Sequence, residues 1–279
     1  MDAKIININP RTGWKAWKNL SIAALLIVSL WGGSLFAITY DNFSSGNINN
    51  SLWDTAYAKG SFSVVEGSSV GVSQAYALHM SSTGDSSYPK ARIITTETFN
   101  GNFRAGINFF NFAYTSNAYT ISPTDPAGPS VNLYVGTDAH FFLVARAVVN
   151  LGSGAVNVIG WKEIINGSEV HRGGTSYTAN SGALLISYVN NVMNLGYSSS
   201  TDPTNWPTTY QSLGSSATTL DGNQFLGIVS SGGGGGKTSV DIGSLNYNYV
   251  VNPVPLPSAI FLLAPGLLGL IGIKRKYLG

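Results

Sequence analysis

Short segments rich in Val, Ile, Tyr, Phe and Thr recur along the middle of this chain, separated by clusters of Gly, Asn, Ser and Pro. Apolar and polar positions alternate in many of these segments, and no stretch longer than ten residues has the apolar stripe of an amphipathic helix. The pattern therefore predicts an all-β domain. We expect strands at residues 62–65, 76–80, 91–96, 103–112, 131–135, 141–149, 156–164, 184–189, 192–197, 225–230 and 238–249.

The clearest local signal is a hairpin between residues 184–189 and 192–197, joined by Asn190 and Asn191. Asparagine tolerates the positive φ that a two-residue turn requires, so the register of this hairpin is well specified. About eleven strands in one domain are typical of two packed sheets. The sequence therefore predicts a two-sheet antiparallel β-sandwich of jelly-roll type.

The N-terminal region has the three-part layout of a secretory signal peptide. Lys15 and Lys18 precede an apolar stretch at residues 20–31, and small or neutral residues lead from there to Ala37. We expect a signal helix here and cleavage by signal peptidase after Ala37. An uncut signal anchor remains the alternative, because the basic region before the apolar stretch is long.

The C-terminal region also has three parts, and the middle one is an apolar run at residues 259–273. At about 1.5 Å per residue these fifteen residues would span roughly 22 Å as a helix, which is shorter than a bilayer core of about 30 Å. A transmembrane helix is expected, with the basic cluster after it on the cytoplasmic side. The flanking parts are Val254, Pro255, Leu256 and Pro257 before the run and Lys274, Arg275 and Lys276 after it.

This order of parts resembles the PEP-CTERM sorting domain of exported proteins in Gram-negative bacteria that make extracellular polysaccharide. The family's name motif has Glu between the prolines, where this chain has Leu256. The resemblance implies processing near residues 255–257 by an exosortase, a membrane-embedded cysteine protease. The alternative is a plain C-terminal membrane anchor that is never cut.

Together the two ends divide the chain into a signal peptide at residues 1–37, a β-sandwich at 38–252 and a sorting signal at 253–279. The sandwich is thus expected to cross the inner membrane and to reach the cell surface or the extracellular space, held for a time by the C-terminal anchor. The PEP-CTERM resemblance also implies a place among exopolysaccharide and biofilm components.

The charge distribution supports this division. Residues 1–37 carry four basic side chains and one acidic one, and the last six residues carry three basic ones. The body between them carries eight basic and twelve acidic side chains, a net charge of −4, although the whole chain has a net charge of +2. The part that folds therefore gives no electrostatic support for binding nucleic acid.

The chain contains no cysteine, which excludes a disulfide framework, a thiol nucleophile and cysteine-ligated zinc. His79, His140 and His171 are the only imidazoles, and they lack the close helical spacing of a zinc protease. We interpret each histidine as an ordinary strand or surface residue.

A second resemblance covers most of the body. Residues 40–46 with Leu52 and Trp53, the run 91–96 leading to 99–105, and the closing residues 240–245 are similar in order to concanavalin A-like lectin/glucanase domains. In that family the last strand returns beside the first, and the run 91–96 would pair with the strand at 103–105. The resemblance implies a jelly-roll body of a fold that is used to handle carbohydrates.

Glucanases that resemble this layout carry paired carboxylates on one strand, where alternation brings them to the same face. The strand in the matching order covers residues 131–136 and has Asn132 and Tyr134 where catalytic acids would stand. We therefore expect no catalytic residues and a non-catalytic protein. The alternative is a secreted polysaccharide hydrolase or lyase with a divergent active site.

Sugar rings stack on aromatic side chains while nearby polar groups bind their hydroxyls, so aromatic and polar residues together mark candidate carbohydrate sites. The alternative to sugar binding is that each aromatic residue simply packs in the core. No cofactor is expected except a structural calcium ion between Asp41 and Asp241, should the first and last strands be neighbours. The candidate carbohydrate-binding residues are Asn132, Tyr134, Arg146, Trp161 and Trp206.

The glycine run at residues 232–236 and the following Lys237 contain the spacing of a phosphate-binding loop. Five consecutive glycines satisfy almost any glycine spacing, and the context is strand, loop, strand. We therefore expect a flexible hairpin tip between the strands at 225–230 and 238–249.

Overall fold

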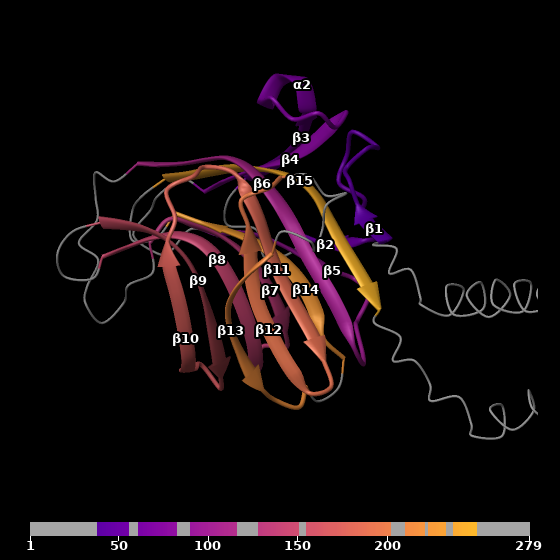
Figure 1. Cartoon of the computed structure of the whole chain (residues 1–279). Helices are drawn as coiled ribbons and strands as arrows, with labels where there is room; N and C mark the ends of the chain where they lie inside the picture. The colour runs from indigo at the N-terminus through magenta and orange to yellow at the C-terminus, as the bar shows by residue number, and fades with distance from the viewer. Residues whose placement is uncertain are drawn as a thin grey trace, which may run out of the picture. The chain divides into compact units, whose positions relative to one another are not determined.

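Two antiparallel sheets packed face to face make up the body of the protein in the computed structural model (Figure 1). The structure describes residues 38–55, 61–82, 90–115, 128–150, 155–201, 210–220, 223–232 and 237–249. The predicted all-β sandwich is thus confirmed, and residues 36–250 form one compact unit. Both predicted targeting segments lie outside the described residues and stay predictions. Among the described residues, no helix combines the length and the apolar character that crossing a bilayer requires.

Sheet A contains both the first and the last of the described strands. The single short helix in the described ranges, α2 (Gly67–Val70), follows strand β3 of this sheet. Strand β1 (Ile38–Asp41) pairs with β15 beside the main order of the sheet. That order is β13 (Gln211–Ala217), β12 (Val192–Ser198), β11 (Gly182–Val189), β6 (Phe103–Thr115), β15 (Lys237–Tyr249), β4 (Tyr76–Ser82) and β3 (Ser61–Glu66).

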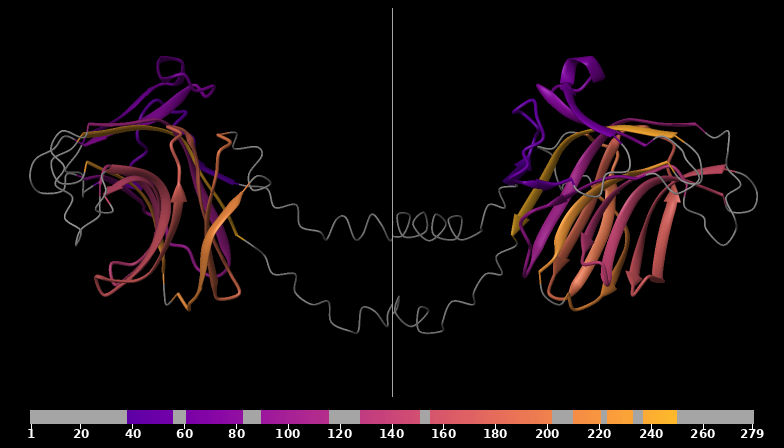
Figure 2. Two further views of the ribbon diagram at one scale, coloured as in Figure 1. Left: turned by 60° about the vertical axis from the view of Figure 1, so that its left-hand side comes forward. Right: turned by 180° about the vertical axis from the view of Figure 1, so that it is seen from behind.

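Sheet B is built largely from a meander of four consecutive strands, β7 to β10, which curve as they run (Figure 2). Its strands lie in the order β10 (Ser168–Ser176), β9 (Ala155–Ile165), β8 (His140–Asn150), β7 (Ser130–Gly136), β14 (Phe225–Ser231), β5 (Lys90–Thr95) and β2 (Trp53–Asp54).

Two sequence-based expectations of connectivity are confirmed. Strand β1 pairs antiparallel with β15, as a return of the last strand beside the first requires. The hairpin of β11 and β12 turns at Asn190 and Asn191, whose φ values are 53° and 61°. Asparagine is one of the few residues that adopts this left-handed conformation at low cost, which explains the position of the turn.

Two other expectations are wrong. β14 lies in sheet B and β15 in sheet A, so the glycine run between them links the two sheets and is not the tip of a hairpin. Likewise, β5 belongs to sheet B and β6 to sheet A, so the two strands that were expected to pair lie in different sheets. In both cases the alternation of a strand predicts which residues share a face, but it does not predict which strand lies beside it.

The core fills the space between the sheets, and alternate residues of each strand supply it. On β8, Phe142, Val144 and Val148 are buried, whereas Leu143 and Ala147 face outward and are partly exposed. Large side chains such as Phe103 and Leu133 from the two sheets meet in the middle. This alternation leaves the outward positions of sheet B free to build a surface feature.

Trp161 closes one edge of the sandwich. Its indole N–H donates a hydrogen bond to the carbonyl oxygen of Leu213 in β13, at 3.1 Å, and the ring is 6% exposed. Gly173 and Gly214 border the ring, and a Cβ atom on Gly214 would lie 2.6 Å from Nε1. The indole therefore fits between the edge strands because neither glycine has a side chain.

Candidate functional site

The outer face of sheet B carries a groove of about 700 Å³ over strands β8, β9 and β10. The groove exists because outward-facing residues on these strands are apolar and mostly small, instead of the polar residues usual on a solvated face. Such a hollow, lined by apolar side chains with a few polar groups, is typical of a ligand site. Its aliphatic floor consists of Leu143, Ala145, Ala147, Val149, Val156 and Val158.

One row of the groove consists of alanine and glycine alone. Ala145, Gly160 and Gly174 stand side by side on β8, β9 and β10. A Cβ atom on Gly160 would come within 2.9 Å of the carbonyl oxygen of Gly173, so the close approach of the strands favours glycine here. The glycine pair therefore adds no side chain to this part of the groove.

Charged side chains stand at one end of the groove. Lys162 and Arg172 lie side by side on β9 and β10, in the row that begins with Leu143. The Lys162 Nζ atom is 2.6 Å from Glu169 Oε2, and the Arg172 guanidinium is 3.4 Å from Oε1 of the same carboxylate. Two cations thus share one acid, and Arg172 keeps 69% of its side chain exposed.

Tyr134 and Asn132 stand on β7 beside the groove, directly opposite the floor residues Leu143 and Ala145. The ring of Tyr134 covers Gly227 of the next strand, where a Cβ atom would collide with it. The Arg92 guanidinium lies 5.4 Å from the centre of this ring, within the range of a cation–π contact.

Asn132 has its amide oriented by two neighbours. Its Nδ2 donates hydrogen bonds to Ser130 Oγ at 2.9 Å and to the carbonyl oxygen of Val229 at 3.2 Å. The side chain is therefore held in one direction beside the groove. Asn132 and Tyr134, which sequence reasoning proposed as sugar contacts, occupy the same outer face, two residues apart.

The other proposed sugar contacts are placed elsewhere. Arg146 and Trp161 point between the sheets, where they are 2% and 6% exposed, although Trp161 still borders the groove. Trp206 lies outside the described residues. Arg146 donates hydrogen bonds to the carbonyl oxygens of Ala147 and Ala179, and burial lowers its pKa. Arg146 and Trp161 are buried because both stand at inward positions of their strands.

The residues that sequence reasoning missed are Lys162, Glu169 and Arg172, together with the aliphatic floor. The sequence did contain a signal for part of this set. Val156, Val158 and Lys162 stand at alternating positions of the segment 156–164, so they belong to one face of the strand. No rule of alternation says which of the two faces is the outer one, because both faces of this segment carry apolar residues.

The two aspartates that were expected to share a calcium ion lie apart. Asp41 stands opposite Leu245, four positions along β15 from Asp241. It accepts hydrogen bonds from the backbone N–H of Phe43 and from Trp53 Nε1, both at 2.7 Å. Each aspartate therefore has its own protein partners. In the part of the chain that the structure describes, no cluster of three or more His, Cys, Asp or Glu residues is arranged to hold a metal ion.

Asp241 is 3% exposed on the outer side of sheet A. It accepts hydrogen bonds from His79 Nδ1 at 2.7 Å and from Asn111 Nδ2 at 2.8 Å. The hydrogen bond to Asp241 raises the pKa of His79, because it favours the charged imidazolium more strongly than partial burial disfavours it. This pair joins β4 to β15 and is a structural contact.

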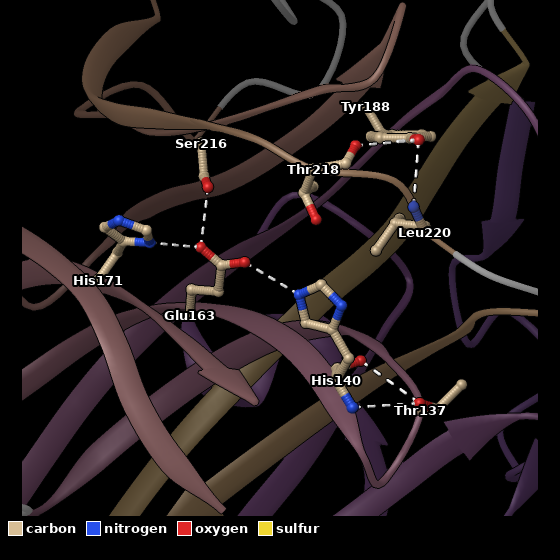
Figure 3. A network of polar contacts seen from close by, with 8 residues as sticks. All are labelled: Thr137, His140, Glu163, His171, Tyr188, Ser216, Thr218 and Leu220. Carbon is tan, nitrogen blue, oxygen red and sulfur yellow. Dashed lines mark hydrogen bonds and ion pairs between the residues drawn. The ribbon is translucent and has the colours of Figure 1, made fainter. Parts of the chain in front are cut away.

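Glu163 is the centre of a second polar network, at the edge of the sandwich (Figure 3). Its carboxylate, 3% exposed, accepts hydrogen bonds from His140 Nε2 at 3.0 Å, His171 Nδ1 at 2.7 Å and Ser216 Oγ at 2.8 Å. Burial alone would raise the pKa of Glu163, but these hydrogen bonds outweigh it and lower the pKa. The histidines approach different carboxylate oxygens, so they satisfy the acid instead of forming an open catalytic pair.

Comparisons with known proteins find similar solved structures. Neither the known protein families nor the curated proteins give a match. Among solved structures, the GH43 protein BlXynB from Bacillus licheniformis gives a TM-score of 0.50 at 12% identity, over 75% of this chain and 39% of that one. The exoplasmic/lumenal domain of VIP36 in a Ca²⁺/Man-bound form gives 0.49 at 12% identity, over 79% and 92%. A legume lectin-like domain from Entamoeba histolytica gives 0.46 at 12% identity, over 72% and 91%.

At 12% identity and a TM-score of 0.50, the likeness to the GH43 protein concerns the fold alone. The chain spans less than half of the GH43 protein that it matches, so nothing about catalysis follows from that match. The fold likeness agrees with the two-sheet architecture, and the function must be argued from the groove.

Proposed function

We propose that this chain is an exported surface or extracellular-matrix protein whose β-sandwich binds polysaccharide without cleaving it. The observation that carries the proposal is the groove on the outer face of sheet B, with Tyr134 and Asn132 standing beside its floor. Apolar C–H faces of sugar rings suit an aliphatic and aromatic lining, and an oriented amide suits their hydroxyl groups.

The arrangement of acidic residues at the groove supports binding without cleavage. Glycoside hydrolysis requires two carboxyl groups that flank the scissile bond, about 5–10 Å apart. The lining residues of the described groove include no acid, and Glu169, which stands at its end, is held by the lining residues Lys162 and Arg172. One carboxylate engaged by two cations does not provide the two free carboxyl groups that the reaction requires.

The export part of the proposal rests on the sequence. The signal peptide ending at Ala37 and the tail from Val254 to Lys276 fit a protein that signal peptidase and exosortase process at the inner membrane. A mature form without either end would be the mildly acidic sandwich, released to the surface or the matrix, where polysaccharide is at hand.

A glycan array with the purified body, residues 38–252, tests the binding function, scored for retention of glycan and for release of products. A tryptophan at Ala147 would fill the groove, and the matched control is Ala113→Trp at an exposed position of β6 in sheet A. We expect retention by the wild type and the control but not by Ala147→Trp. Released products would favour the hydrolase or lyase alternative, and a lack of retention on every glycan would refute the proposal.

A further inference from the structure

We propose that the groove selects anionic polysaccharides, and that a charged substituent of the sugar chain takes the place of Glu169 between Lys162 and Arg172. The inference rests on the proposed function and adds the class of ligand. Both cations line the groove, and Glu169 already shows how a carboxylate sits between them. The pair is thus a ready-made receptor for a carboxylate, sulfate or phosphate group.

Displacing Glu169 costs little. The contacts of Glu169 with Lys162 and Arg172 are on the surface, and Arg172 keeps most of its side chain exposed. Ion pairs near the surface contribute little to stability, because water and salt screen them and side-chain entropy opposes them. A ligand that brings its own anion can therefore replace Glu169 with a small loss and keep the same geometry.

The charge at the groove is opposite to that of the surrounding body. The body has a net charge of −4, whereas the groove end presents two cations to one acid. Glu163, next to Lys162 in sequence, points inward and is occupied by its three donors. On the far side of β7, Arg92 lies 3.9 Å from the exposed Asp138 and adds no net charge to the face. The positive potential is therefore local to Lys162 and Arg172.

The row arrangement gives the anion a fixed place relative to the sugar rings. Lys162 and Arg172 share a row with Leu143, and Ala145 and Ala147 follow in the next two rows of β8. Neighbouring positions on one face of a strand are about 7 Å apart, so the two alanines lie about one and two such steps from the cations. A polysaccharide chain along β8 would place a charged substituent at the cations and its ring faces over the alanines.

The test compares polygalacturonate with neutral dextran of similar length, using the full chain in a mild non-ionic detergent. We expect binding of polygalacturonate that weakens with salt, and at least tenfold weaker binding of dextran. Arg172→Gln should weaken binding of polygalacturonate about tenfold, and Glu169→Gln should strengthen it several-fold because the internal competitor is lost. Arg104→Gln on sheet A is the matched control and should change neither value. Unchanged unfolding midpoints would show that the variants are folded.

Duplex DNA of equal total charge serves as a polyanion control. It distinguishes binding of sugar chains in the groove from non-specific attraction to any polyanion. We expect weak DNA binding that Ala147→Trp does not alter, whereas the same substitution abolishes binding of polygalacturonate. Equal affinity for dextran and polygalacturonate would overturn the inference and leave the proposed function intact. DNA binding as tight as that of polygalacturonate, or weaker binding by Glu169→Gln, would also overturn it. A lack of binding to both glycans would count against the proposed function itself.

Discussion

Ser216 on β13 donates a hydrogen bond to Glu163 on β9 across 2.8 Å, and this contact joins sheet A to sheet B at the edge of the sandwich. The other two donors to Glu163, His140 and His171, come from the strands on either side of it in sheet B. One buried carboxylate thus connects four strands. Its charge is tolerated there because each donor offsets part of the cost of desolvation.

Replacing Glu163 by Gln should lower the free energy of unfolding by about 2–4 kcal/mol, because three donors lose a charged, buried acceptor and the amide brings donors of its own. Ser216→Ala removes one donor and should cost only about 1 kcal/mol. Urea unfolding of the body, residues 38–252, measures both. If Glu163→Gln were as stable as the wild type, the carboxylate would not hold the sheets together.

The same carboxylate predicts a dependence of stability on pH. The pKa of Glu163 in the folded protein lies below its ordinary value near 4.5, so ionised Glu163 stabilises the fold above pH 4.5. This contribution is lost as the pH falls through the lower, folded value. The stability gap between the wild type and Glu163→Gln should therefore be wide at pH 7 and narrow towards pH 3. A gap independent of pH would contradict the lowered pKa.

His79 should show the opposite trend. Because the hydrogen bond to Asp241 raises the pKa of His79 above 6.5, the pair stabilises the fold below pH 6.5, and this stabilisation is lost as the pH rises through the folded value. NMR titration of the His79 ring should give a midpoint above 6.5 in the wild type and a lower one in Asp241→Asn. His79→Gln should be more destabilising at pH 5.5 than at pH 9. Identical midpoints in the two proteins would exclude the contact as the cause.

The strands that sequence patterns predicted well are those with one strongly apolar face, such as β3 and β12. The patterns missed β10 and β13, which are edge strands rich in Ser, Gly and charged residues and largely exposed. Edge strands gain their place from one neighbour and from contacts such as that of Ser216 with Glu163, which leave no periodic signal in the sequence.

Only the β7 side of the groove could be predicted from the sequence, and the β8 side could not. Asn132 and Tyr134 stand at alternate positions of a strand with an evident apolar inner face, so their outward direction could be inferred. Strand β8 is apolar on both faces, and nothing in its sequence shows that Arg146 points inward while Ala145 and Ala147 point outward. Which face becomes the core is decided by the opposite sheet, and a single strand carries no information about that sheet.

Gly214→Ala should destabilise the sandwich by about 1–3 kcal/mol, because the added methyl group would press on the Trp161 ring from 2.6–2.9 Å. Thermal unfolding of the body measures the loss, and Ser215→Ala at the neighbouring exposed position is the control. A second substitution, Trp161→Phe, shortens the ring that the methyl group meets. The double variant should therefore be more stable than the sum of the single effects predicts. Strict additivity would show that Gly214 does not make room for Trp161.

Alanine at both Pro255 and Pro257 should leave the mature protein larger than normal and retained in the inner membrane, if the tail is a sorting signal. Proline fixes φ and keeps its predecessor out of the helical region, so the segment before the apolar run is expected to stay extended, as a protease substrate requires. Two alanines would instead favour continuing the apolar helix outward. Western blots of membrane and medium fractions from the native host measure size and location. Asn252→Ala leaves residues 254–257 unchanged and serves as the control. A plain membrane anchor would give the same size and the same membrane location for all three proteins.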